Sequence, residues 1–154
     1  MSSPTQDGSQ NEFDAASRLY FSGDYVAAFD PLVRLSDTHP MAAHFVGVIE
    51  QMGLGDREAN NGSAAAWYVK AANGGIGVAA FNLGILHEAG LLDGGNAASA
   101  RPFYEQAWEL GHEPALEKLS ALYGATGQGT SASLRQPDYH AKRRNLWDRI
   151  VGRR

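Results

Sequence analysis

The sequence predicts an all-α fold, a right-handed α-α solenoid of antiparallel helix pairs closed by a C-terminal capping helix. A segment of about 36 residues recurs along the chain. Within each copy, small and apolar residues return at helical intervals. Glycines follow these periodic stretches, where a left-handed residue can end a helix.

The composition is that of a packed domain. The chain has 154 residues, of which 44% are hydrophobic and 19% charged, so it can bury a core. No apolar run approaches the roughly 20 residues that a membrane span needs. The beginning lacks the basic end and apolar stretch of a secretory signal, so we expect a cytoplasmic protein. Because there is no cysteine, neither disulfides nor thiolate metal sites are available.

The repeat domain is predicted to cover residues 12–124, after a polar and disordered segment over residues 1–11. Its first unit, about residues 13–40, has the pattern of a helix, a tight turn and a second helix. Pro31 lies inside that second helix and predicts a kink there.

Two complete copies follow, at about residues 41–77 and 78–113. Each predicts a first helix with a glycine at its centre, a glycine turn, and a second helix whose aromatic pair fills the gap between the helices. A third copy, residues 114–124, contains only a first helix. The matching segments are Ala42–Gly47 with Ala79–Gly84, and Trp67-Tyr68 with Phe103-Tyr104.

This pattern resembles the Sel-one-like repeat, a relative of the tetratricopeptide repeat, over residues 13–124. The tyrosine usual near the end of the first helix is replaced by Glu50 and His87, and the loops that follow also depart from the pattern. The resemblance implies a solenoid whose first helices line a groove for peptides or domains of other proteins. It rests on Ala42, Val46, Gly47, Gly53, Gly55, Trp67, Tyr68, Lys70, Ala71, Ala72 and Gly75.

The resemblance also implies a set of partner-binding residues, placed by their distance from the central glycine of each first helix. Their apolar members would form a floor and their polar members a rim, as in protein recognition sites. The alternative is that Phe81 and Ile85 are core residues covered by the C-terminal tail. The predicted residues are Ser17, Phe21, His44, Val48, Gln51, Phe81, Ile85, Glu88 and Glu117, with Asp24, Met52, Ala89 and Ala121 beside them.

Charge is distributed unevenly along the chain. Residues 1–130 carry six basic and fifteen acidic side chains, whereas residues 131–154 carry seven basic and two acidic ones. An acidic body favours basic protein partners and makes nucleic acid an unlikely one. We therefore expect an adaptor or scaffold that binds another protein. The alternative is a bacterial immunity protein that neutralises a basic toxin, and an enzyme is a remote third possibility.

The sequence offers no catalytic or metal-binding motif. No two histidines have the spacing of a metal-binding pair, and the glycine runs lack the lysine of a phosphate loop. Glu50 and His87 occupy equivalent positions of neighbouring first helices, which is more typical of substituted core tyrosines than of an acid–base pair. We expect no cofactor and no metal.

The C-terminal part is predicted to be a glycine- and serine-rich linker over residues 125–137, followed by a basic amphipathic helix over residues 138–154. This helix would cap the solenoid or fold into its groove, with its basic face against the acidic body. Partner binding or dimerisation through this helix is an alternative, and its binding to a membrane surface or to nucleic acid is unlikely. The predicted tail contacts are Lys142, Arg143, Arg144, Trp147 and Ile150.

Overall fold

The computed structural model describes residues 4–126 of the chain, and side chains over residues 8–124. The described residues form seven helices and no strand. Most of the predicted linker and the whole predicted C-terminal helix lie outside them. The helices are α1 (Pro4–Phe21), α2 (Tyr25–Leu35), α3 (Pro40–Met52), α4 (Asn61–Asn73), α5 (Gly77–Glu88), α6 (Ala97–Glu109) and α7 (Ala115–Thr126).

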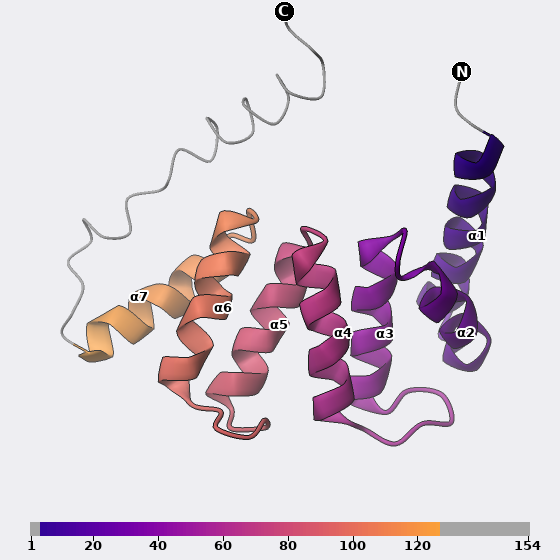
Figure 1. The fold of residues 1–154 in the computed structure, drawn as a ribbon. Helices are drawn as coiled ribbons and strands as arrows, with labels where there is room; N and C mark the ends of the chain where they lie inside the picture. The colour runs from indigo at the N-terminus through magenta and orange to yellow at the C-terminus, as the bar shows by residue number, and fades with distance from the viewer. Residues whose placement is uncertain (1–3, 127–154) are drawn as a thin grey trace, which may run out of the picture.

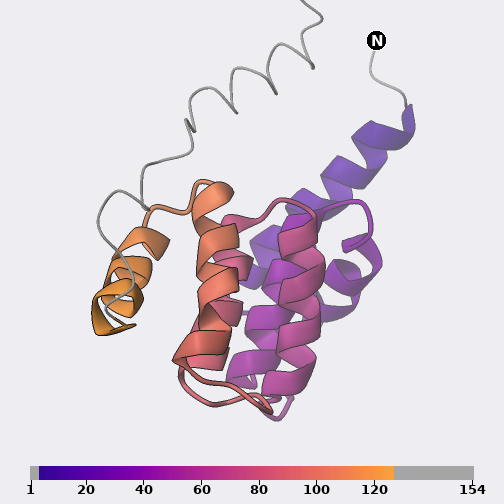
Figure 2. The same ribbon diagram turned by 60° about the vertical axis from the view of Figure 1, so that its left-hand side comes forward.

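The helices stack in chain order, from α1 at one end of the molecule to α7 at the other (Figure 1). Helices α1 and α2, α3 and α4, and α5 and α6 form antiparallel pairs, and α7 packs on α6. Seen from the second direction, the first helices α3 and α5 form one layer and the second helices α4 and α6 another (Figure 2). The predicted all-α solenoid of helix pairs is confirmed.

Helix α1 begins earlier than predicted. It starts at Pro4, so residues 4–11 are helical and the predicted disorder of residues 1–11 is wrong for this stretch. A proline is well suited to the first turn of a helix, because its φ is already helical and its missing N–H has no partner there. Further along, the ring of Phe13 stacks on His39 with 4.8 Å between centroids, and the Ser9 hydroxyl lies 3.4 Å from Nδ1 of His39. These contacts hold α1 against the start of α3.

Glycine and asparagine residues mark where the helices end and begin. Gly53 ends α3 with a φ of 61°, in the left-handed region that favours glycine. Asn60 and Asn96 then cap α4 and α6, each accepting a hydrogen bond from the backbone N–H three residues later, at 2.9 and 3.0 Å. Pro102 lies inside α6, which starts at Ala97.

The core is rich in alanine and is filled by two buried tyrosines. Tyr68 of α4 and Tyr104 of α6 are both fully buried. The Tyr68 ring lies against Gly47 at the centre of α3, and the Tyr104 ring lies against Gly84 at the centre of α5. The aromatic residues therefore fill the gap between the two helices of each pair, as the repeat predicts.

Candidate partner-binding surface

Helix α3 leaves only one narrow side uncovered. Eight of its 13 residues are buried, and its open residues are Pro40, Met41, Val48, Gln51 and Met52. The non-buried apolar residues of α5 follow the same register, because Val78 and Ile85 stand 37 residues after Met41 and Val48. We call this set the open stripe: Met41, Val48 and Met52 on α3, with Val78, Phe81 and Ile85 on α5.

The tyrosines of the second helices tie neighbouring first helices together. The Tyr68 hydroxyl donates a hydrogen bond of 2.6 Å to Gln51 on α3, and it also has a hydrogen-bonding contact with the side chain of Asn82 on α5. The Tyr104 hydroxyl donates one of 2.5 Å to Glu88, which also receives a 2.7 Å hydrogen bond from Lys118 on α7. Gln51 and Glu88 therefore form a fixed polar edge beside the open stripe.

Glu88 carries a negative charge on this edge. The hydrogen bond from Lys118 and then that from Tyr104 lower the pKa of its carboxyl, against a smaller opposing effect of burial. Burial, together with the hydrogen bond to the charged Glu88, raises the pKa of Tyr104, so the phenol stays protonated and donates. The polar edge thus presents a carboxylate at neutral pH.

Two large apolar side chains near this surface are strongly exposed. Met52, at the end of α3, is 64% exposed, and Phe21, at the end of α1, is 74% exposed. Phe21 meets the ring of Phe45 edge-on, at 5.4 Å between centroids, so it lies beside α3. Its exposed ring extends the apolar surface from α3 towards α1.

Other predicted residues are less open than expected. His44 is only 9% exposed, between the rings of Phe45 and Tyr68, so the prediction that it contacts a partner is corrected. Burial lowers its pKa from 6.5 to about 4. The Ser17 hydroxyl and Nδ1 of His44 are both buried without a hydrogen-bond partner among the described residues. Glu117 is exposed, as a rim residue should be.

Phe81 combines the two roles considered for it. Its ring meets Tyr104 at 5.4 Å and His112 at 4.7 Å between centroids, so part of it belongs to the core. The rest is open, and no described segment covers it. Ile85 is likewise partly buried and packs against the same core.

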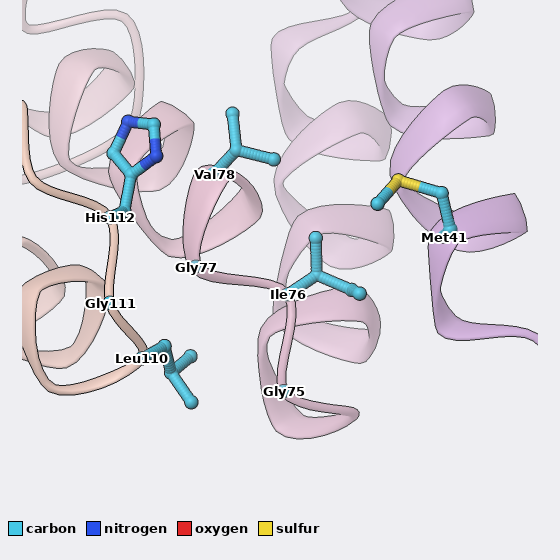
Figure 3. A pocket seen from close by; sticks show the side chains of 8 residues that line it. All are labelled: Met41, Gly75, Ile76, Gly77, Val78, Leu110, Gly111 and His112. Atoms are coloured by element: carbon cyan, nitrogen blue, oxygen red, sulfur yellow. The ribbon is translucent and has the colours of Figure 1, made fainter. Parts of the chain in front are cut away.

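One feature of this surface was missed from the sequence: a shallow apolar hollow of about 270 Å³ at the beginning of the open stripe (Figure 3). Met41 and Val78 belong both to the hollow and to the open stripe. Each stands seven residues, or two helical turns, before a predicted contact residue, so extending the register towards the helix starts would have found them. The hollow is lined by Met41, Gly75, Ile76, Gly77, Val78, Leu110, Gly111 and His112.

The two residues considered for catalysis each have another partner. Glu50 is paired with Arg57 at 3.2 Å, and His87 stacks on Phe103 at 4.7 Å between centroids. Over the described residues, no cluster of three or more histidine or carboxylate side chains could hold a metal ion. None of the described helices combines the length and the apolar character that crossing a membrane requires.

Comparison with known proteins finds similarity to solved structures. No protein-family model matches the chain, and no curated protein does. The chain is similar to the crystal structure of a Sel1 repeat protein from Oxalobacter formigenes, with a TM-score of 0.60 and 30% sequence identity. The similarity covers 70% of this chain and 44% of that protein, so the chain spans less than half of that relative. With its repeated pairs of a helix-centre glycine and a buried tyrosine, the chain has the Sel1-like repeat fold.

Proposed function

We propose that this chain is a non-enzymatic interaction module that binds a segment of another protein along the open stripe. The observation that supports this best is the chemistry of α3, a helix buried on every side but one, whose uncovered side is apolar. Exposed apolar patches with a polar edge are typical of protein interaction sites. Met52 and Phe21 would be the anchors, because they are the most exposed large apolar residues of this surface.

The charges of the module favour a basic partner. Over the described side chains, four of the six basic groups are paired with carboxylates. Many acidic groups have no such pairing, and Asp24 and Glu117 are both exposed. An acidic surface speeds the encounter with a basic segment and makes the association dependent on ionic strength. An adaptor for a basic segment fits this surface, and a basic toxin held by an immunity protein would be a special case of it.

The proposal is tested with single substitutions that do not disturb the fold. The partner is first isolated with the full chain as bait and identified by mass spectrometry, and its Kd is then measured for each variant. Met52→Ala and Phe21→Ala should each weaken binding about tenfold or more, the size of a hot-spot residue. Val69→Ala is the matched control, since Val69 is an exposed apolar residue, 43% exposed, on the second-helix layer. It should leave the Kd within about twofold.

The reverse result would place the partner on a different surface of the molecule. If Val69→Ala weakens binding of the partner and Met52→Ala does not, the partner binds the second-helix layer and the open stripe is not the site. The immunity alternative has its own outcome: the isolated partner would be a basic toxin, and adding the chain would abolish its activity at equimolar ratio.

A further inference from the structure

The hollow at the beginning of the open stripe has the size of a single side-chain site. Met41, Ile76 and Val78 form one side of it, and Leu110 and His112 the other (Figure 3). Its volume of about 270 Å³ lies below the roughly 300–1,000 Å³ of typical small-molecule pockets. Its lining side chains are apolar except that of His112, and burial lowers the pKa of His112, so the imidazole adds no positive charge at neutral pH. One large apolar side chain suits this hollow better than a polar ligand.

Carboxylates lie next to the lining residues of the hollow in the sequence. Glu109 and Glu113 flank the lining residues Leu110–His112, and Glu117 follows one turn into α7. All three are exposed, and none has an ion pair or side-chain hydrogen bond among the described residues. The apolar side chains of the hollow and the unpaired carboxylates that follow and precede them in the chain are together complementary to a segment that has a large apolar residue next to several basic ones.

The chain itself contains such a segment. Residues 138–154 carry six basic and two acidic side chains, and the basic run Lys142–Arg144 stands just before Trp147. The 11 residues between Thr126 and residue 138 can span up to about 36–40 Å when extended. The way back along α7, 12 residues, is only about 18 Å. Because the segment is tethered, its effective concentration at the hollow is on the order of millimolar.

We propose that residues 138–154 dock on this chain's own hollow, with Trp147 in the hollow and Lys142–Arg144 against Glu109 and Glu113. Met41 and Val78 line the hollow and also begin the open stripe. The docked segment therefore occupies one end of the surface assigned above to a partner, and a partner that uses this end must displace it. The docking itself does not depend on the existence of that partner.

The absence of cysteine allows a direct test in the full-length chain. A nitroxide label on Ala141→Cys, the only thiol in the protein, broadens the NMR signals of amides that lie near residue 141. The expected result is selective broadening of the amides of residues 110–117, unchanged on tenfold dilution. Glu109→Lys with Glu113→Lys should abolish the broadening, and adding Arg143→Glu with Arg144→Glu should restore it.

A matched control and three contrary outcomes make the test decisive. Asp56→Lys with Glu58→Lys makes the same charge change on two exposed residues of the loop after α3, and should leave the broadening intact. Broadening centred on the ends of α1 and α3, broadening that fades on dilution, or no broadening at all would each overturn the proposal. The first places the segment elsewhere, the second makes it bind a second copy, and the third leaves it undocked. None of these outcomes changes the result expected from the substitutions that test partner binding.

Discussion

The ring of Tyr68 lies against the backbone of Gly47, so closely that a Cβ on Gly47 would stand 2.6 Å from Cε1 of the tyrosine. The same relationship recurs between Tyr104 and Gly84 in the next pair. Neither glycine is at a turn, and neither has a positive φ. Their role in the helix centre is therefore spatial: they let a buried phenol of the second-helix layer reach past the first helix to Gln51 or Glu88.

Gly47→Ala should destabilise the fold by up to about 2 kcal/mol. Overpacking a core costs about 1–3 kcal/mol, partly offset by the roughly 1 kcal/mol that alanine gains over glycine in a helix. Tyr68 cannot easily yield, because it is fully buried and its hydroxyl is held by Gln51. Urea denaturation at pH 7 measures the change. Gly62→Ala is the control, in the exposed first turn of α4. The added Cβ would lie 3.5 Å from its nearest neighbour, Oδ1 of Asn60, so this change should be neutral or stabilising. Equal stability of the two variants would contradict the spatial role.

Glu88→Gln should reduce the loss of stability that the fold shows as the pH falls. The folded pKa of Glu88 is lowered below its ordinary value of 4.5, so its contribution to stability is present above that value and is lost as the pH falls through the folded pKa. Between pH 5 and pH 3 the unmodified chain should therefore lose more stability than Glu88→Gln. The amide fits this position, since Gln51 accepts the equivalent tyrosine hydrogen bond in the preceding pair. Denaturation midpoints across this range measure the effect, and Glu117→Gln, at an exposed site, should keep the slope of the unmodified chain.

His44→Phe should remove part of the pH dependence between pH 7 and pH 4. Burial lowers the folded pKa of His44 to about 4 from 6.5, so the unfolded chain binds the proton first as the pH falls. The contribution of neutral His44 is complete above about pH 6.5 and is lost towards pH 4, by at most about 3 kcal/mol at 1.36 kcal/mol per unit. Phenylalanine fits this position, which Phe81 occupies in the next copy.

The measurement for His44→Phe is the difference in unfolding free energy between pH 7 and pH 5. The lowered pKa of His112 should leave a smaller dependence of the same sign in the variant. A variant with the same difference as the unmodified chain would show that His44 has the same pKa in the folded and the unfolded protein. Such a result would also mean that its buried Nδ1 has an acceptor or donor that the described residues do not provide.

The repeat made most of the helical scaffold predictable. A period of 36–37 residues fixes the register of each copy, so the contact of Gly47 with Tyr68 and the partly open positions of Val48 and Ile85 follow from the alignment of copies. Register does not determine how deeply a side chain is buried, however. His44 and Phe81 are equivalent in register, yet His44 is buried between the rings of Phe45 and Tyr68, whereas the next copy has Asn82 in place of Phe45.

Two other features depend on contacts between distant segments. The early start of α1 is stabilised by Phe13 on His39, a pairing that the polar composition of residues 1–11 does not reveal. The hollow is formed where the α4–α5 turn and the α6–α7 turn come together, through Gly77 and Gly111. Turn chemistry predicts each loop separately, but the space between two loops becomes apparent only when the helices are packed.

Phe81→Ala and Phe21→Ala should differ strongly in stability although both residues were predicted for the same surface. Phe81 loses ring contacts with Tyr104 and His112 on truncation, so a cost of about 2–3 kcal/mol is expected for this partly buried phenylalanine. Phe21 is 74% exposed, and its truncation should change stability by no more than about 0.5 kcal/mol. Urea denaturation of both variants at pH 7 measures the difference. Similar costs would mean that the Phe21 ring is packed in solution, and in that case it could not serve as a free anchor for a partner. A large difference would make Phe21 the substitution that separates binding from folding, because any loss of affinity could not then be attributed to a weakened core.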